Sequence, residues 1–247
     1  GESGENSNHW YYEVFKLLEE NNIGWNFWTH KKVDKITSPY SALVTPQYQV
    51  IIDYLRGAIA QPDPNIAGMG LTSFANSLKI ENCITRPGVI ASLTDPEYGE
   101  ISKPYTTHSI PGTIPAAYYD IGARGLSYSD SDYWNDGDGG YNDGWVFRND
   151  GVDVEGSDDD PNIPYTVGWT EAGEWLGYTI EDVSPGTYEV SFSISAPDAG
   201  GIFFAQLSGQ NLGVIDVPAT GGWYNWEDLP AQTCLLYTSP SPRDAHK

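Results

Sequence analysis

The sequence predicts an α/β region followed by an all-β sandwich, because the spacing of its apolar residues changes along the chain. Before residue 95, apolar residues recur every three or four positions, which is typical of helices with one buried face. After residue 110 they alternate with polar residues, which is typical of strands. The irregular stretch 96–109, with Pro96 and Pro104, is predicted to be a linker between the two regions.

The first predicted helix covers residues 7–20. Apolar residues recur there at helical spacing, and Ser7 or Asn8 can cap the free amides at the helix start. The next run, IGWNFW at 23–28, is short and apolar, and such runs are typical of buried strands. Loop, helix and strand in this order indicate part of an α/β unit.

Two more helices are predicted before residue 95. Thr45 can cap the second helix, Pro46 suits its first position, and Gly57 ends it. A third, short helical stretch is predicted over residues 71–80.

The strongest strand signal lies at residues 188–195, YEVSFSIS, where apolar and polar residues alternate. The turn Ser-Pro-Gly at 184–186 joins it to a preceding strand predicted over 175–180. Further short strands are predicted around Val146, around Val167, at 203–207 and at 214–217. Short strands separated by Gly, Asn and Asp turns are typical of a β-sandwich.

Charge excludes two classes of partner. The chain holds 34 Asp and Glu against 12 Lys and Arg, which gives a formal net charge of -22 at pH 7. Such a field repels nucleic-acid phosphates and anionic membrane lipids, so the expected partner is neutral or cationic. No apolar run approaches the roughly 18 residues that would span a bilayer.

Aromatic residues point to a sugar ligand. They make up 13% of the chain, with 9 Trp and 17 Tyr, which is more than a core of this size needs. Flat rings in glycine-rich loops are suited to stacking on sugar rings in water. The expected partner is therefore a neutral polysaccharide. The family resemblances described next imply a plant or algal cell-wall polysaccharide, a β-glucan with xylan as the further possibility, and an extracellular location, with any signal peptide outside this fragment.

The first region resembles glycoside hydrolase family 5, the cellulase type. The resemblance rests on GESGENSNHWYYEVFKLLEENNIGWNFWTHKK at the start of the chain and on FANSLKIENC at 74–83. It implies that residues 1–95 are the C-terminal fragment of a TIM barrel, with Glu2 as the catalytic nucleophile and Trp28 as the platform under the sugar. Glu5 is the alternative nucleophile, Glu2 could be a solvated loop carboxylate, and Trp28 could be a core ring.

A retaining glycosidase of this kind requires two carboxyl groups about 5–5.5 Å apart. The resemblance places the general acid on a strand that would precede Gly1. A TIM barrel also needs about 250 residues, far more than this region holds. The fragment alone is therefore expected to be catalytically inactive.

The second region resembles carbohydrate-binding module family 6 over residues 110–232. Four blocks occur in the family's order: IPGTIPAAYYD, GLSYSDSDYWNDGDGGYNDGWVFRNDGVDVEG, YTVGWTEAGEWLGYTI and VPATGGWYNW. The resemblance implies a jelly-roll β-sandwich in which Phe147 and Trp223 clamp a sugar ring, although either ring could be buried instead. Trp169 and Trp175 are predicted to pack in the core or against a sheet.

No cofactor is expected for catalysis, and a structural calcium ion is doubtful. The acid-rich loops DSDYWNDGDGG and GSDDDPN offer oxygen ligands, but their spacing does not fit a twelve-residue calcium loop. Family 6 modules hold calcium with a Glu-x-Glu pair. Pro115 and Ala117 stand at these positions and supply no side-chain oxygen.

Residues 233–247 resemble translated adapter sequence and are predicted to be a tail outside the fold. Taken together, the sequence predicts a fragment of a secreted endo-β-1,4-glucanase with an appended polysaccharide-binding module. The alternatives are a non-catalytic carbohydrate-binding or adhesion protein, and a hydrolase directed at xylan or mannan.

Overall fold

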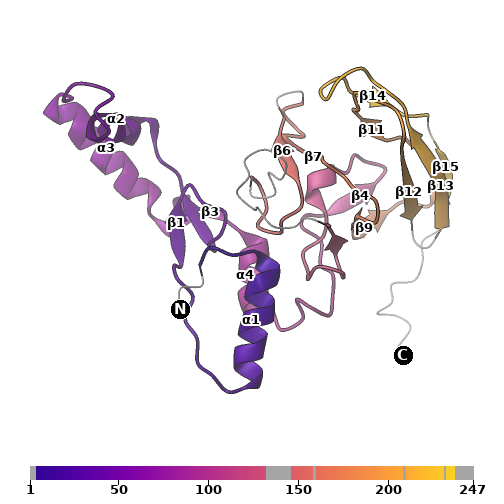
Figure 1. Cartoon of the computed structure of the whole chain (residues 1–247), viewed down its shortest axis with the longest axis horizontal. Helices are drawn as coiled ribbons and strands as arrows, with labels where there is room; N and C mark the ends of the chain where they lie inside the picture. The colour runs from indigo at the N-terminus through magenta and orange to yellow at the C-terminus, as the bar shows by residue number, and fades with distance from the viewer. Residues whose placement is uncertain (1–3, 132–145, 158–159, 208–209, 231, 237–247) are drawn as a thin grey trace. The chain divides into compact units, whose positions relative to one another are not determined.

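The computed structural model describes residues 4–131, 146–157, 160–207, 210–230 and 232–236 (Figure 1). The chain divides into two compact units. The first unit holds residues 1–108 and 114–179, and the second holds residues 109–113 and 180–247. The chain passes between the units within residues 108–114 and at 179–180, whereas the predicted boundaries lie at 95 and 110. The assignment of a hydrolase fragment and a binding module to residue ranges stays a prediction.

Helix α1 (Asn8–Glu20) confirms the first predicted helix. The Ser7 hydroxyl accepts a hydrogen bond from the backbone N–H of Trp10 at 3.2 Å, which satisfies one free amide at the helix start. The buried face of α1 carries Tyr11 and Phe15, which pack against Val89 of helix α4 (Pro87–Thr94).

Helix α2 (Pro46–Leu55) confirms the second predicted helix, with Thr45 as its cap. Helix α3 (Pro64–Ser77) begins earlier than predicted, because Asp63 caps it and Pro64 occupies its first position. A short 3-10 helix, η1 (Ile80–Asn82), follows α3.

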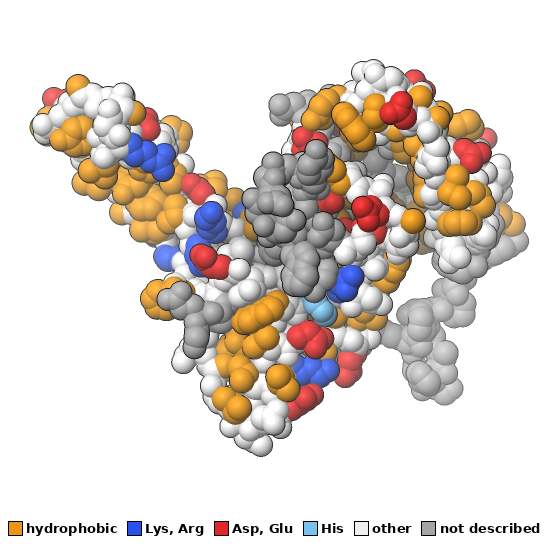
Figure 2. All heavy atoms as spheres, viewed as in Figure 1, with side chains coloured by type: hydrophobic (Ala, Val, Ile, Leu, Met, Phe, Trp, Pro, Cys, Tyr) orange, Lys and Arg blue, Asp and Glu red, His pale blue; other side chains and the backbone are white. Residues whose placement is uncertain are grey.

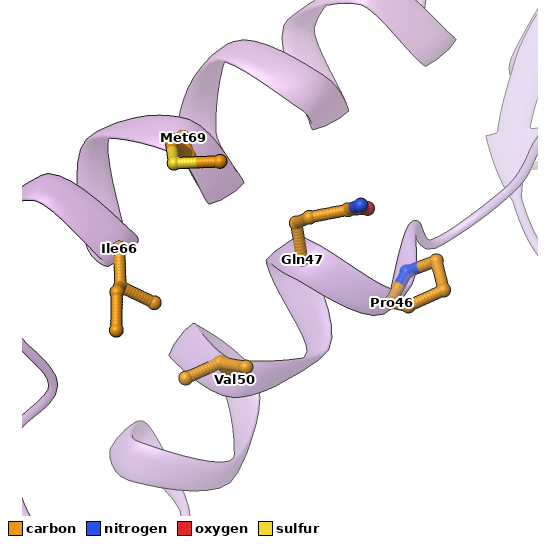
Figure 3. A pocket seen from close by; sticks show the side chains of 5 residues that line it. All are labelled: Pro46, Gln47, Val50, Ile66 and Met69. Atoms are coloured by element: carbon orange, nitrogen blue, oxygen red, sulfur yellow. The ribbon is translucent and has the colours of Figure 1, made fainter.

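Helices α2 and α3 lie side by side and form a hairpin (Figure 1). Between them is an open pocket of about 270 Å³, lined by Pro46, Gln47, Val50, Ile66 and Met69 (Figure 3). The lining has no acid, base or nucleophile, so it offers no catalytic chemistry. Apolar side chains cover much of the hairpin surface in Figure 2, and Leu55 and Met69 are 73% and 65% exposed.

Three short strands form one sheet in the same region: β1 (Lys31–Val33), β2 (Tyr40–Ala42) and β3 (Ile84–Thr85). Strand β2 pairs in parallel with β1 and antiparallel with β3. In the described residues before 95 these strands form no closed barrel.

The strand predicted at 23–28 is wrong, since the backbone there is irregular. Its rings are used differently: Trp25 and Phe27 are half-buried and pack on the core of α1. The apolar run therefore marks a packed loop.

The rest of the first unit is built from short antiparallel strand pairs. Strand β5 (Tyr128–Ser129) pairs with β8 (Trp175–Leu176), and β6 (Val154–Gly156) pairs with β7 (Tyr165–Val167). The 3-10 helix η2 (Ala116–Tyr118) packs beside them. Their common core consists of Ala117, Tyr119, Tyr128, Val152 and Val154.

The predicted linker packs within the first unit along much of its length. Tyr98 and His108 are buried, and Lys103 forms a backbone bridge to Ile121. Lys103 also forms ion pairs with Asp95 at 2.6 Å and Glu97 at 3.0 Å. These contacts hold residues 95–108 against the strands that follow.

The second unit consists of short antiparallel strands, in agreement with the predicted all-β region. Its strands are β9 (Ile180–Val183), β10 (Gly186–Val190), β11 (Ser193–Ile194), β12 (Gly201–Leu207), β13 (Gln210–Val217), β14 (Glu227–Asp228) and β15 (Gln232–Leu236). Strand β4 (His108–Ile110), whose last two residues belong to this unit, pairs with β9. The other pairs are β10 with β15, β11 with β14, and β12 with β13 (Figure 1).

Strand β15 corrects the prediction that the fold ends at residue 232. It pairs antiparallel with β10, and the register matches Gly186 with Leu236 and Tyr188 with Cys234. Cys234 and Leu236 are buried, with 0% and 5% exposure. Residues 233–236 therefore belong to the fold, because their alternating burial fills the core of this unit. Residues 237–247 lie outside the described part.

Candidate functional site

A loop at residues 220–226 of the second unit presents three aromatic side chains to solvent. Trp223 is 67% exposed, Tyr224 61% and Trp226 36%. Aromatic rings that are exposed to this extent leave apolar surface in contact with water. They are therefore suited to bind a ligand with a flat and partly apolar face. We call residues 220–226 the aromatic loop.

Hydrogen bonds fix the first half of the aromatic loop to the segment after β11. The backbone N–H of Thr220 donates to the carbonyl of Ala196 at 2.8 Å, and the backbone N–H of Ala196 donates to the Thr220 hydroxyl at 2.9 Å. The Ser195 hydroxyl donates to the carbonyl of Trp223. The rings are therefore held by backbone anchors and do not depend on a ligand for their placement.

Glycines shape the turn beneath the rings. Gly221 has φ +85°, a conformation that side chains with a Cβ rarely adopt. At Gly222, a Cβ would lie 3.2 Å from Nδ2 of Asn225, and that amide donates to the carbonyl of Thr220 at 3.3 Å. The two glycines therefore let the chain turn tightly while Trp223 faces outward.

The surroundings of the aromatic loop are acidic. Glu227 and Asp228 follow the loop directly on β14, and Asp198 lies two residues after its anchor Ala196; all three are exposed. The described part of the second unit holds no Lys, Arg or His. The local field is therefore negative.

Sequence reasoning singled out Trp223 in this loop and missed two of its neighbours. Tyr224 and Trp226 also stand in the TGGWYNW block, and both are exposed. Their closeness to the Gly-Gly pair was the available signal. The anchors Ser195 and Thr220 carry no distinctive pattern.

Phe147, the second predicted platform, lies in the first unit within a cluster of half-buried rings. It stacks on Tyr165 with ring centroids 4.1 Å apart and also contacts Tyr118 and Tyr105. One face of the ring is therefore occupied by protein. Because Phe147 and Trp223 belong to different units, the clamp between them stays a prediction.

Trp169 and Trp175 are not core residues, and packing against a sheet, the other predicted role, stays a prediction. They are 38% and 42% exposed. Trp175 lies on β8, a strand of two residues, and Trp169 has φ +48° in the connection before it. Short strands at the surface cover little of a large indole, which is why both remain exposed.

The loop before α1 lies against the backbone of Trp28. A Cβ at Gly4 would lie 1.2 Å from the Trp28 carbonyl oxygen, so only glycine fits there. Lys32 donates to the Gly4 carbonyl and pairs with Glu5 at 2.8 Å. Trp28 is 62% exposed, as a platform requires.

Of the two candidate nucleophiles, Glu2 lies outside the described residues. Glu5 is exposed, and its hydrogen bond and charge interaction with Lys32 lower the pKa of its carboxyl group. Its ionised form is therefore favoured, which is the form a nucleophile needs. The role of either residue stays a prediction.

Neither a metal cluster nor a membrane span is found in the described residues. No three His, Cys, Asp or Glu side chains gather there as metal ligands, and no helix is long and apolar enough to cross a bilayer. Pro115 and Ala117 stand at the positions where family 6 modules bind calcium. Pro115 precedes η2, and Ala117 is buried within it. The acid-rich residues 132–145 lie outside the described part.

Residues 148–238 match a family model described as carbohydrate binding module (family 35). The match supports a carbohydrate-binding module. It covers the aromatic loop and β15, and the family is 35 instead of the family 6 that the sequence blocks resemble. The match covers none of residues 1–95, so it gives no support to the hydrolase part.

A relative of part of the chain is the clotting factor G alpha subunit of Tachypleus tridentatus. The two are 37% identical over 60 residues, which is 23% of this chain and 9% of that protein. The chain thus spans a small part of that relative's length.

Proposed function

We propose that the protein binds polysaccharide through the aromatic loop of its carbohydrate-binding module. The observation that carries this proposal is the exposure of Trp223 and Tyr224 on a loop held by backbone hydrogen bonds. The family match over residues 148–238 supports the class of ligand.

The proposed recognition is stacking of sugar rings on indole and phenol faces. A pyranose ring with equatorial hydroxyls has apolar C–H faces, and an aromatic ring removes these faces from water. Because the anchors at Ser195 and Ala196 hold the loop in place, little conformational entropy is lost on binding. The expected ligands are cell-wall β-glucans, and the proposed location is therefore extracellular.

The test is affinity electrophoresis of the full chain in gels that contain soluble cellulose derivative, xylan, mannan or laminarin. Trp223→Ala is expected to weaken retention by about tenfold or more, the usual effect of removing a central aromatic contact. Phe204→Ala is the matched control, since Phe204 is 65% exposed in the same unit but lies on β12. Unchanged retention of the Trp223 variant would refute the proposal, and the gels also rank the glycans.

We further propose that this module belongs to a retaining endo-β-glucanase in which Trp28 contacts the sugar and Glu2 is the nucleophile. The exposure of Trp28 beside the Gly4 loop supports its proposed contact with the sugar. The module would then keep the enzyme near an insoluble substrate and raise its effective concentration.

This second proposal has its own measurement. Trp28→Ala, added to the Trp223→Ala variant, should lower the remaining affinity for cello-oligosaccharides further. Hydrolysis of soluble β-glucan by this chain should stay at background, because the resemblance to family 5 implies a general acid that is not among these residues. If the Trp223→Ala/Trp28→Ala double variant binds cello-oligosaccharides as tightly as the Trp223→Ala variant, Trp28 does not contact the sugar. Turnover by this chain would contradict the expected inactivity.

A further inference from the structure

We propose that the aromatic loop prefers amino-sugar glycans, whose protonated amines are cationic, over neutral glycans with the same backbone. Uronic-acid glycans are rejected by the same charges. This inference rests on the proposed function of the loop and adds the ligand class that it selects.

The first observation is the one-sided charge of the second unit. Its described residues include no basic side chain. The acidic side chains are Glu181, Asp182, Glu189, Asp198, Asp216, Glu227 and Asp228. A ligand at the loop therefore meets negative charge without a neutralising cation from this part of the unit.

The second observation is where these charges lie. Strand β14 carries Glu227 and Asp228 and starts directly after Trp226. It pairs with β11, so that Ile194 lies opposite Glu227 and Ser193 opposite Asp228. The residues that follow β11 anchor the aromatic loop at Thr220 and Trp223, and β14 with its carboxylates begins where the loop ends.

Both carboxylates are available to a ligand. Glu227 and Asp228 are exposed, and no ion pair joins either one to a side chain in the described ranges. An exposed ion pair strengthens binding by a factor of about 1.5 to 5, so contact of a ligand amine with one of these carboxylates gives up to about fivefold. Salt should remove this gain, since charges at an exposed site are screened.

The rings add to the same preference. An ammonium group over the face of Trp or Tyr is attracted by the ring quadrupole, and a neutral hydroxyl is not. Trp223 and Tyr224 are exposed, and the two carboxylates follow them closely in the chain. A polymer of β-1,4-linked glucosamine presents a flat backbone to the rings and an amine on every sugar, so it can use both interactions.

The experiment compares hexamers of glucosamine, N-acetylglucosamine, glucose and galacturonate by titration calorimetry of the full chain. The pH is set where the amines are protonated and the carboxylates ionised. The glucosamine hexamer is expected to bind about fivefold more tightly than cellohexaose, and galacturonate not detectably. At about 1 M salt, where screening acts within about 3 Å, the ratio should fall to about one.

Variants separate local charge from net charge. The double variant Glu227→Gln/Asp228→Asn should lose the glucosamine preference and keep cellohexaose affinity. The matched control, Glu181→Gln/Asp182→Asn, removes two exposed charges from β9 and should keep the preference. A preference that survives the first double variant, or that the control also loses, would overturn the inference.

Trp223→Ala distinguishes failure of this inference from failure of the proposed function. If the parent binds both hexamers equally and the variant binds neither, the loop binds glycans and the charge preference is wrong. If the variant keeps the parent's affinity for the glucosamine hexamer, binding follows the net charge and both proposals fall.

Discussion

The side-chain amide of Asn8 donates a hydrogen bond of 2.7 Å to the carboxylate of Asp150, a residue 142 positions later in the chain. Beside it, the backbone N–H of Asn8 donates to the carbonyl of Asn149 at 2.8 Å, and the Asn149 amide donates to the carbonyl of Asn6 at 2.8 Å. These buried bonds fasten the start of α1 to the segment where the module match begins.

Asp150 also forms a buried ion pair with Arg148 at 2.9 Å, with side chains 3% and 5% exposed. Asp150→Ala should lower the free energy of unfolding by about 3–5 kcal/mol, because it leaves a buried guanidinium without its partner. Urea denaturation measures the loss. The control is Glu97→Gln, whose surface pair with Lys103 should contribute at most about 1 kcal/mol. Equal losses in the two variants would contradict this account.

Gly4→Ala should destabilise the first unit, because the new Cβ would collide with the Trp28 carbonyl and force the loop away. The expected loss is about 1–3 kcal/mol, as for other overpacked sites. Gly24→Ala is the control, since nothing lies within 4 Å of its Cβ position. Thermal unfolding distinguishes them, and a Gly4 variant as stable as the Gly24 variant would show that the close approach is absent.

Leu236→Ala should cost about 2–5 kcal/mol of stability, because the side chain is buried in strand β15. The neighbouring Leu235 is 42% exposed, and Leu235→Ala should cost clearly less. Chemical denaturation of the two variants tests whether β15 is part of the fold. If residues 233–236 were a tail, neither substitution would change the unfolding midpoint.

Alkaline pH should destabilise the first unit. Burial raises the pKa of Tyr11 from 10.0 to about 12 and raises those of Tyr98, Tyr119 and Tyr128 well above 10.0. Their neutral forms are favoured in the folded state, so this stability is full below pH 10 and is lost as pH rises through 12 and beyond. Tyrosinate absorbance should therefore rise together with loss of near-ultraviolet circular dichroism. Ionisation of these tyrosines without unfolding would contradict the prediction.

Local signals were sufficient to predict helices α1 and α2, but not the start of α3, the helix α4 or the burial of single rings. Caps such as Ser7 and Thr45 act within three residues, so α1 and α2 could be located from the sequence. The burial of Trp25, Trp169 and Trp175 depends on which segments cover them. That information is not local. The predicted strand at 23–28 was wrong for this reason, and so was the core alternative for Trp169 and Trp175.

The candidate site shows the same limit. Trp223 could be predicted because Gly221 and Gly222 beside an indole indicate an exposed turn. The anchoring by Ser195 and Thr220 joins residues more than twenty positions apart, and a serine or threonine in a loop gives no sign of its partner. The last strand was missed because its composition resembled foreign sequence, whereas its burial depends on pairing with β10.

The rings of the aromatic loop lie on one short turn and are exposed to solvent. A glycan can therefore bind to these rings through one side of the sugar chain alone, and a free chain end is not required. On the proposed function, chains still packed in a fibre therefore qualify as ligands, and attachment to intact wall material requires no prior loosening of the fibre.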